Sequence, residues 1–194
     1  HFLANVGEGG RDSYPIHWSK RYLEETHLVP FQKAFQQGKS RSVMTSYNLL
    51  DGRPSTANHW LLTEKLKKEW DFKGFVISDA SAVGGANVLH FTAKDYDDAS
   101  AQAMNAGLDV IFQTEYNHYK LFMPPFLDGR ISKERIDDAV ARVLRAKFEL
   151  GLFENPFVSS KDIDELKKIN HKLLAEKAAI ESFVLLQNTN QTLP

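Results

Sequence analysis

Asp79 is the residue whose placement in this sequence most suggests chemistry. The run GFVISD (residues 74–79) is apolar or small until it ends on this acid, and the small residues Ala80, Ser81 and Ala82 follow. In parallel α/β folds, side chains at the carboxyl ends of strands converge on one open face where ligands bind. An acid there with small neighbours leaves room for a ligand. The position is equally typical of an aspartate that caps the next helix, so both interpretations stay open.

Two other predicted strands also carry polar residues. Tyr47 ends the run SVMTSY (residues 42–47), where its phenol could donate to a carboxylate on the neighbouring strand or simply pack at the rim of the sheet. Asp109 lies inside the run LDVIFQ (residues 108–113), where an unpaired acid would be costly. We therefore expect a structural role for Asp109, with backbone amides as its partners.

Several familiar functional motifs are missing from the sequence. The segment NVGEGGRDSYP (residues 5–15) has three glycines but lacks GxGxxG and a following Lys-Ser/Thr. We expect it to be a loop over the site, with Arg11 and Asp12 as candidate polar contacts. The seven histidines show neither HExxH nor another compact ligand spacing, and no GxSxG occurs. The sequence therefore predicts neither a metal site nor a Ser-His-Asp hydrolase.

The composition is that of a globular protein. The 194 residues are 42% hydrophobic and 25% charged, with a formal net charge of -1, and no dense basic stripe favours nucleic acid as a partner. There is no cysteine, so disulfides and thiolate metal sites are excluded. No apolar run approaches the roughly 18 residues of a membrane span, so we expect no membrane partner. The chain begins at His1 and ends soon after an apolar run at residues 183–186, so we expect a piece of a longer polypeptide.

Helical patterns alternate with the three predicted strands. They cover residues 19–38 with a kink at Pro30, the face Leu62, Leu66 and Trp70, and residues 95–105, 132–151 and 171–182. This alternation predicts βαβ units and a parallel sheet. With a strand ending near His1 the count is about four, half of an eight-stranded barrel, while a doubly wound open sheet is the alternative. A domain boundary is expected near residues 156–160.

Taken together, these segments resemble the catalytic barrel of glycoside hydrolase family 3. His1-Phe2 resembles the end of its Lys-His-Phe signature, and residues 42–79 resemble its central block. AGLDVIF resembles its next strand, RIDDAVARVLRAKFELGLFE its closing barrel helix, and ESFVLLQNTNQTLP the entry into its second domain. The resemblance implies an α/β fold: residues 1–157 as the C-terminal half of a (β/α)8 TIM-type barrel, and residues 158–194 as a linker helix and first strand of an α/β-sandwich domain.

The resemblance also implies a retaining, exo-acting β-glycosidase that needs no cofactor or metal. Asp79 matches the catalytic nucleophile and Tyr47 the residue that orients it. His1, Met44 and Arg11 match substrate-binding positions. The implied substrate is a β-linked oligosaccharide or β-glucoside with a terminal β-glucosyl residue, and a β-xylosidase of the same family is the alternative. A non-catalytic sugar-binding barrel fragment is the alternative from another functional class.

Three departures from the family pattern matter. The lysine expected before His1 is missing, and Ala80 stands where a tryptophan often follows the nucleophile. The loop Asp12-Ser13-Tyr14 lacks the acid/base histidine of the β-N-acetylhexosaminidase branch, which disfavours that branch. In the other branches the acid/base is a glutamate of the second domain, beyond Pro194.

The resemblance therefore makes the remaining part of the same enzyme, an N-terminal half-barrel and the second domain, a partner of this chain. A homodimer is compatible with the sequence, although no feature favours one. The favoured location is that of a periplasmic or secreted bacterial enzyme, and the cytoplasm is the alternative.

Overall fold

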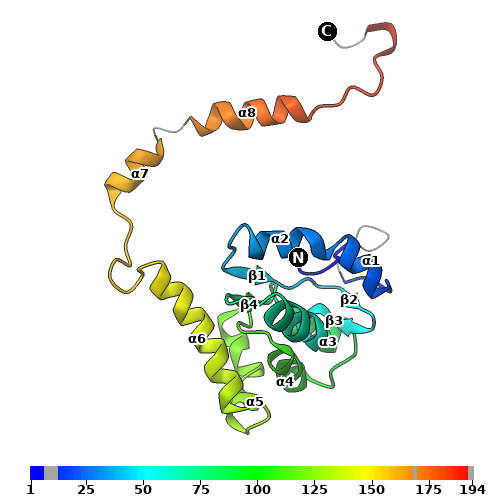
Figure 1. The fold of residues 1–194 in the computed structure, drawn as a ribbon, viewed down its shortest axis with the longest axis vertical. Coiled ribbons are helices and arrows are strands. Elements are labelled where there is room, and N and C mark those ends of the chain that lie inside the picture. Colours follow the sequence, from blue (N-terminus) through cyan, green and yellow to red (C-terminus); the bar gives the residue numbers. More distant parts are fainter. Residues whose placement is uncertain (7–12, 168–169, 192–194) are drawn as a thin grey trace. The chain divides into compact units, whose positions relative to one another are not determined.

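The computed structural model describes residues 1–6, 13–167 and 170–191 and divides the chain into two units (Figure 1). The first unit is His1–Leu150 and the second is Gly151–Pro194. The division falls before residues 156–160, where the domain boundary remains a prediction. No helix in the described parts of the chain is long and apolar enough to cross a membrane.

Short parallel strands form the centre of the first unit. Strand β1 (Ser42–Met44) pairs with β4 (Phe75–Ile77), with Val43 opposite Val76. Isolated parallel bridges extend this pair on both sides, from Phe2 to Thr45 and from Ile77 to Val110. The predicted alternation of strands and helices is therefore confirmed as a mixed α/β arrangement. The regular pairing is shorter than the expected runs. Strands β1 and β4 have three residues each, and the expected strands near His1 and at residues 108–113 contribute one bridge each.

An antiparallel hairpin follows the first predicted strand and is absent from the sequence-based prediction. It joins β2 (Leu49–Leu50) to β3 (Arg53–Pro54) through Asp51 and Gly52. Both turn residues have positive φ, 50° and 77°, as the primed two-residue hairpin turns require. The Asp-Gly pair directly after the apolar Leu49 and Leu50 was the available sequence signal.

The first helical segment breaks at a different place from the one predicted. Helix α1 (Lys20–Glu25) and helix α2 (Leu28–Gln36) are separated at Thr26 and His27, so the expected kink at Pro30 is wrong. Pro30 lies in the first turn of α2, where its missing N–H has no intrahelical partner to lose.

Three further helices of this unit lie where the sequence predicts a helix, whereas the shorter elements were not predicted. A π-helix (Trp60–Glu69) and the residue after it bury Leu62, Leu66 and Trp70. Helix α4 (Tyr96–Ala106) is capped by Asp95 and ends at Gly107, whose φ is +116°. Helix α6 (Lys133–Glu149) is capped by Ser132. The shorter elements are α3 (Ala82–Val88), α5 (Pro124–Leu127) and the 3-10 turns Ser55–Ala57 and Tyr116–Leu121.

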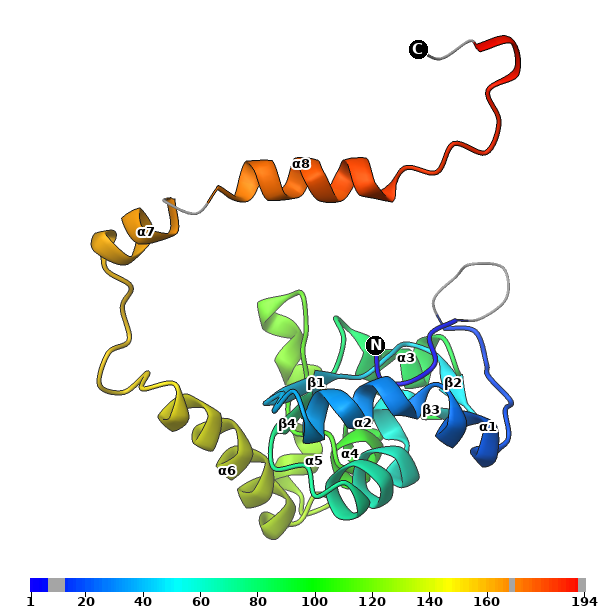
Figure 2. The same ribbon diagram turned by 45° about the horizontal axis from the view of Figure 1, so that its top comes forward.

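One face of the strands is packed far more closely than the other. An aromatic cluster joins Phe2 to α2 and to the residues after the π-helix, with ring centroids between 4.7 and 6.4 Å apart; its members are Phe2, Phe31, Phe35, Trp70 and Phe72. Figure 2 shows α2 alongside β1. Val76 is fully buried, whereas Met44 on the opposite face is 37% exposed.

The second unit consists of helix α7 (Ser160–Lys167), helix α8 (His171–Ser182) and the segment after it. Helix α8 matches the predicted helix at residues 171–182. Residues 183–188 have no regular secondary structure. A strand exists only through hydrogen bonds to a neighbour, so the strand at residues 183–186 stays a prediction.

Candidate active site

Asp79 lies two residues beyond β4, at the carboxyl end of the strand. Its carboxylate oxygen Oδ1 accepts a hydrogen bond from the N–H of Ala80 at 2.6 Å, and its side chain is 15% exposed. The turn that follows is fixed by backbone hydrogen bonds from Ala82 N to Asp79 O and from Ser81 N to Phe112 O. Asp79 is therefore held at the strand end with its carboxylate partly open to solvent.

The helix-capping interpretation of Asp79 does not hold. Helix α3 begins at Ala82, and Ser81 occupies the N-cap position with a left-handed φ of 60°. The Asp79 carboxylate lies two positions before that cap and contacts Ala80 and His1. An acid followed by small residues is compatible both with an N-cap residue and with a residue in the turn that precedes an N-cap. The sequence pattern therefore does not distinguish the two.

His1 supplies the partner of the second carboxylate oxygen. Its ring nitrogen Nε2 contacts Oδ2 of Asp79. The side-chain amide of Asn5 donates to the other ring nitrogen, Nδ1, at 2.6 Å. Because an amide NH₂ is only a donor, Nδ1 accepts and Nε2 carries the hydrogen that faces Asp79. Asn5 thereby sets the orientation of His1, a role that the sequence-based prediction missed.

The pairing of Phe2 explains why His1 reaches this place. Phe2 N donates to Met44 O and Ser46 N donates to Phe2 O, both at 2.9 Å, so Phe2 runs parallel to the end of β1. The contact between His1 and Asp79 therefore joins two segments that lie on opposite sides of β1.

Tyr47 contacts both the turn after Asp79 and the imidazole of His1. Its hydroxyl donates to the backbone carbonyl of Ala80 at 3.0 Å, and its ring meets the His1 ring edge-on, with centroids 5.6 Å apart. The sequence-based prediction gave this phenol a carboxylate as acceptor. The observed acceptor is instead the carbonyl one residue beyond Asp79, which positions Tyr47 to brace the turn.

Of the other two predicted site residues, Met44 belongs to β1 and Arg11 lies outside the described residues. Met44 is opposite Ile77 in the β1–β4 register, so strand alternation puts it on the same face as Ile77 and Asp79. Asp12 also lies outside the described residues. The structure thus brings Asp79, His1 and Tyr47 together and adds Met44 to their face.

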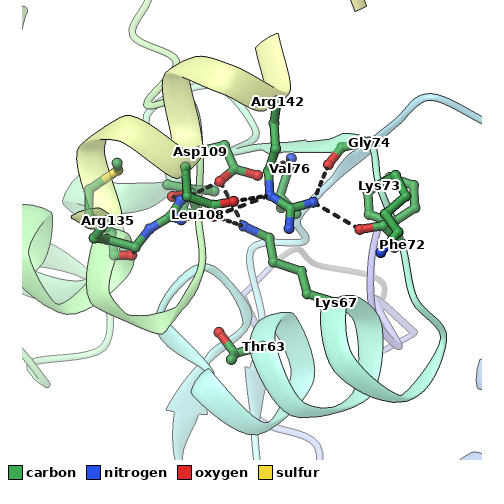
Figure 3. A network of polar contacts seen from close by, with 12 residues as sticks. Thr63, Lys67, Phe72, Lys73, Gly74, Val76, Leu108, Asp109, Arg135 and Arg142 are labelled. Atoms are coloured by element: carbon green, nitrogen blue, oxygen red, sulfur yellow. Dashed lines mark hydrogen bonds and ion pairs between the residues drawn. The ribbon is translucent and has the colours of Figure 1, made fainter. Parts of the chain in front are cut away.

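Asp109 occupies the opposite end of the same strands and has a structural role, as predicted. Its buried carboxylate accepts the N–H of Val76 at 2.8 Å and the Nζ of Lys67 at 2.7 Å, and it pairs with Arg135 (Figure 3). Arg142 donates to the carbonyls of Phe72 and Gly74 just before β4. This network ties α6 to the start of the strand whose far end carries Asp79.

Burial and neighbouring charges act in opposite directions on the pKa values of Lys67 and of Asp138, an α6 residue that pairs with Arg135 and Arg142. Burial lowers the pKa of Lys67 from its ordinary 10.5 to about 8, although Asp109 acts in the opposite direction. For Asp138, burial acts to raise the pKa, but Arg142, Lys67 and Arg135 outweigh it and the pKa of Asp138 is lowered. The positive charges beside Asp138 therefore favour its carboxylate form.

Neither end of the strands is built like a metal centre. Within residues 1–6, 13–167 and 170–191, no three His, Cys, Asp or Glu side chains are grouped so that they could hold a metal ion. What the Asp79 site offers is an oriented carboxylate with a donor at each oxygen, next to an imidazole and a phenol. Such a carboxylate can act on carbon as a nucleophile or on a hydroxyl as a base.

Comparisons with known proteins converge on one family. The family model described as the N-terminal domain of glycosyl hydrolase family 3 matches residues 1–146. A periplasmic β-glucosidase of Salmonella typhimurium is 34% identical over an aligned length of 202 residues that covers 100% of this chain and 26% of that protein. A β-xylosidase of Formosa agariphila is 32% identical over an aligned length of 183 residues that covers 91% of this chain and 25% of that protein.

A solved structure gives the same result. A β-glucosidase from Erythrobacter marinus superimposes with a TM-score of 0.87 at 34% identity, covering 100% of this chain and 26% of that one. The chain thus spans about a quarter of the length of these relatives.

Proposed function

This chain belongs to glycosyl hydrolase family 3, and from that membership we propose that it carries the nucleophile, Asp79, of a retaining, exo-acting β-glucosidase. The observation that carries the proposal is the constellation at the end of β4. Asp79 is held by Ala80 and His1, and Tyr47 braces the turn. These are the positions that the family pattern assigns to the nucleophile, a sugar-binding histidine and an orienting tyrosine.

The proposed reaction begins with attack of the Asp79 carboxylate on the anomeric carbon of the terminal sugar. This attack forms a covalent glycosyl-enzyme while an acid protonates the departing oxygen. Water then attacks the same carbon, with the former acid acting as base, and the sugar leaves with its anomeric configuration retained. The acid/base is a glutamate outside this chain, held about 5–5.5 Å from the nucleophile.

The neighbouring residues support this chemistry by positioning. The Nε2–H of His1 faces Oδ2 of Asp79, so a sugar hydroxyl that accepts this hydrogen would lie next to the nucleophile. Tyr47 fixes the turn through the carbonyl of Ala80, so the attacking oxygen keeps its direction. Met44 and Arg11 complete the proposed substrate-binding set.

We further propose that residues 1–157 form the C-terminal half of a (β/α)8 barrel. The parallel strand order and the exposure of Met44 on the less covered face support this architecture. An N-terminal half-barrel of the same enzyme would cover that face, and a second domain that begins within residues 158–194 would supply the acid/base. The share of the relatives that this chain spans supports such a division.

The proposed substrate carries a terminal, non-reducing β-glucosyl residue, and the periplasm or the outside of the cell is the proposed location. The similarity to β-glucosidases supports the proposed substrate, and the similarity to a periplasmic β-glucosidase supports the proposed location. A β-xylosyl substrate is the second candidate, because a relative of comparable similarity is a β-xylosidase. One hydroxymethyl group separates the two sugars, and a single contact can decide between them.

Replacing Asp79→Asn in the complete enzyme tests this function. We expect hydrolysis of an aryl β-glucoside to fall by more than about a thousandfold, with the melting temperature unchanged, because the amide cannot form the glycosyl ester. Asp71→Asn, an exposed aspartate, is the matched control and should keep full activity. A parallel assay with an aryl β-xyloside ranks the two sugars. Near-normal turnover by the Asp79 variant would refute the assignment, and a wild-type protein that binds sugar without hydrolysing it would support the binding fragment.

A further inference from the structure

We propose that His90 is a positioning residue for this reaction, acting on Asp79 through Tyr47. The inference rests on the proposed role of Asp79 as the nucleophile. His90 belongs to none of the segments from which the catalytic role was argued. Its contact with Tyr47 is visible only in the folded structure.

The first step is a hydrogen bond between two distant segments. Nε2 of His90 lies 2.7 Å from the backbone carbonyl oxygen of Tyr47. A carbonyl oxygen can only accept, so Nε2 carries the hydrogen and donates it. The His90 side chain therefore holds the main chain of Tyr47 in place.

The second step leads from Tyr47 to the carboxylate. The Tyr47 hydroxyl donates to the carbonyl of Ala80 at 3.0 Å, and the N–H of Ala80 donates to Oδ1 of Asp79 at 2.6 Å. Three consecutive hydrogen bonds thus connect His90 to the proposed attacking group. A shift of the Tyr47 backbone would move its phenol and release the turn that orients Asp79.

His90 lies in a loop that several hydrogen bonds hold against α3. Its backbone N–H bonds Gly85 O at 3.0 Å, at the end of α3. Thr92 N bonds Ala86 O at 2.8 Å, and the side chain of Asn87 donates to Ala93 O at 2.9 Å. Leu89 N also donates to Gly85 O at 3.0 Å, so hydrogen bonds to α3 hold this loop on both sides of His90. A donor on a pinned loop can restrain Tyr47, whereas a donor on a free loop would move with it.

A purely structural role is the competing explanation. If the bond from His90 only closed the loop at residues 89–94, its loss would lower the melting temperature and leave the rates of the folded enzyme unchanged. A positioning role demands more, because displacing a reacting group by about 1 Å can cost about a hundredfold in rate. The two roles are therefore separated by kcat and not by stability.

The test compares His90→Ala and His90→Gln with the control His118→Ala in the complete enzyme. His118 is an exposed histidine of the Tyr116–Leu121 turn. The measurements are kcat and KM for an aryl β-glucoside, the rate of inactivation by a 2-deoxy-2-fluoro-β-glucoside, and the melting temperature. Glutamine places an amide N–H close to the position of Nε2, so it keeps the donor.

We expect His90→Ala to lower kcat and the inactivation rate at least about tenfold while KM changes less than about threefold. His90→Gln should recover both rates to within about threefold of wild type, and His118→Ala should match wild type. Wild-type rates for His90→Ala, or equal losses for the alanine and glutamine variants, would overturn the inference.

A double variant keeps the inference testable if His90→Ala is poorly folded. In that case His90→Met, which fills the site but has no N–H donor, replaces His90→Ala. Tyr47→Phe removes the bond to Ala80, so combining it with His90→Met should lower kcat no further than Tyr47→Phe alone, and a multiplicative loss in the double variant would contradict the shared route. Labelling of wild-type Asp79 by the 2-deoxy-2-fluoro-β-glucoside separates the two proposals. If Asp79 is not labelled, the proposed function is wrong. If Asp79 is labelled and His90→Ala has wild-type rates, only the role of His90 is wrong.

Discussion

The ring nitrogen Nε2 of His1 lies against the carboxylate oxygen Oδ2 of Asp79, across the strand β1 that separates their segments. The opposite oxygen, Oδ1, is held by the N–H of Ala80. One oxygen thus has a fixed backbone partner and the other a side-chain partner that a substrate hydroxyl could share. The two carboxylate oxygens of Asp79 are therefore not equivalent. A bound substrate that contacts His1 would also affect Asp79 through Oδ2.

Replacing His1→Ala should therefore lower kcat/KM at least about tenfold, because a hydrogen bond to a charged group contributes roughly 1.5–3 kcal/mol. Steady-state kinetics of the complete enzyme on an aryl β-glucoside measure this. His17→Ala is the control, because the side chain of His17 is 65% exposed and its nearest acid, Asp51, lies 3.9 Å away. Equal kcat/KM for His1→Ala and wild type would contradict the role of His1.

Replacing Asp109→Ala should destabilise the fold by about 3–5 kcal/mol. It would leave Lys67 and Arg135 buried without their carboxylate and would remove the acceptor of Val76 N–H. Denaturant unfolding measures the change. Asp97→Ala removes a carboxylate that is 35% exposed and lies 3.4 Å from Arg130, and it should cost less than about 1 kcal/mol. Similar costs for the two variants would show that the buried network does not hold α6 to β4.

The stability of the protein relative to Lys67→Met should rise as the pH increases from about 8 towards 10.5. Burial lowers the pKa of Lys67 to about 8 in the folded state from an ordinary value of 10.5, so in this window the unfolded chain binds the extra proton. The free energy of unfolding then increases with pH, here by at most on the order of 3 kcal/mol. Lys68→Met, an exposed neighbour, should show no such trend. A flat or falling difference for Lys67→Met would contradict this pKa shift.

Replacing Gly107→Ala should destabilise the protein by at least about 2 kcal/mol, because the residue has φ +116° and an added Cβ would lie 2.7 Å from Thr63 Oγ1. Gly129→Ala is the matched control. Gly129 also has a positive φ, +86°, but nothing lies within 4 Å of an added Cβ, so about 1 kcal/mol is expected. Thermal unfolding of both variants measures the difference, and equal losses would show that the close contact with Thr63 is unimportant.

The sequence alone was sufficient for features that depend on neighbouring residues. The helices expected at residues 95–105 and 132–151 follow from local sequence patterns, and α4 and α6 begin and end within two residues of these ranges. The structural role of Asp109 followed from the cost of an acid inside a strand. The break before α2 was missed because Pro30 disrupts a helix interior but is tolerated in a first turn.

Features that depend on long-range contacts could not be predicted in this way. The partner of the Tyr47 hydroxyl is a backbone carbonyl, and a carbonyl has no residue type to signal it. Asn5 and His90 act through ring or amide nitrogens on groups that only the folded chain brings near. His90 carries no local signal in the sequence, where it is one of seven scattered histidines.

Trapping the glycosyl-enzyme tests the central claim most directly. The complete enzyme is treated with a 2-deoxy-2-fluoro-β-glucoside, whose fluorine slows release of the sugar from the nucleophile, and is then digested and analysed by mass spectrometry. The proposed function predicts one added fluoroglucosyl group on the peptide that contains Asp79, located on that side chain by fragmentation. A label on a peptide without Asp79, or an active enzyme that turns over the reagent and never carries the label, would contradict it.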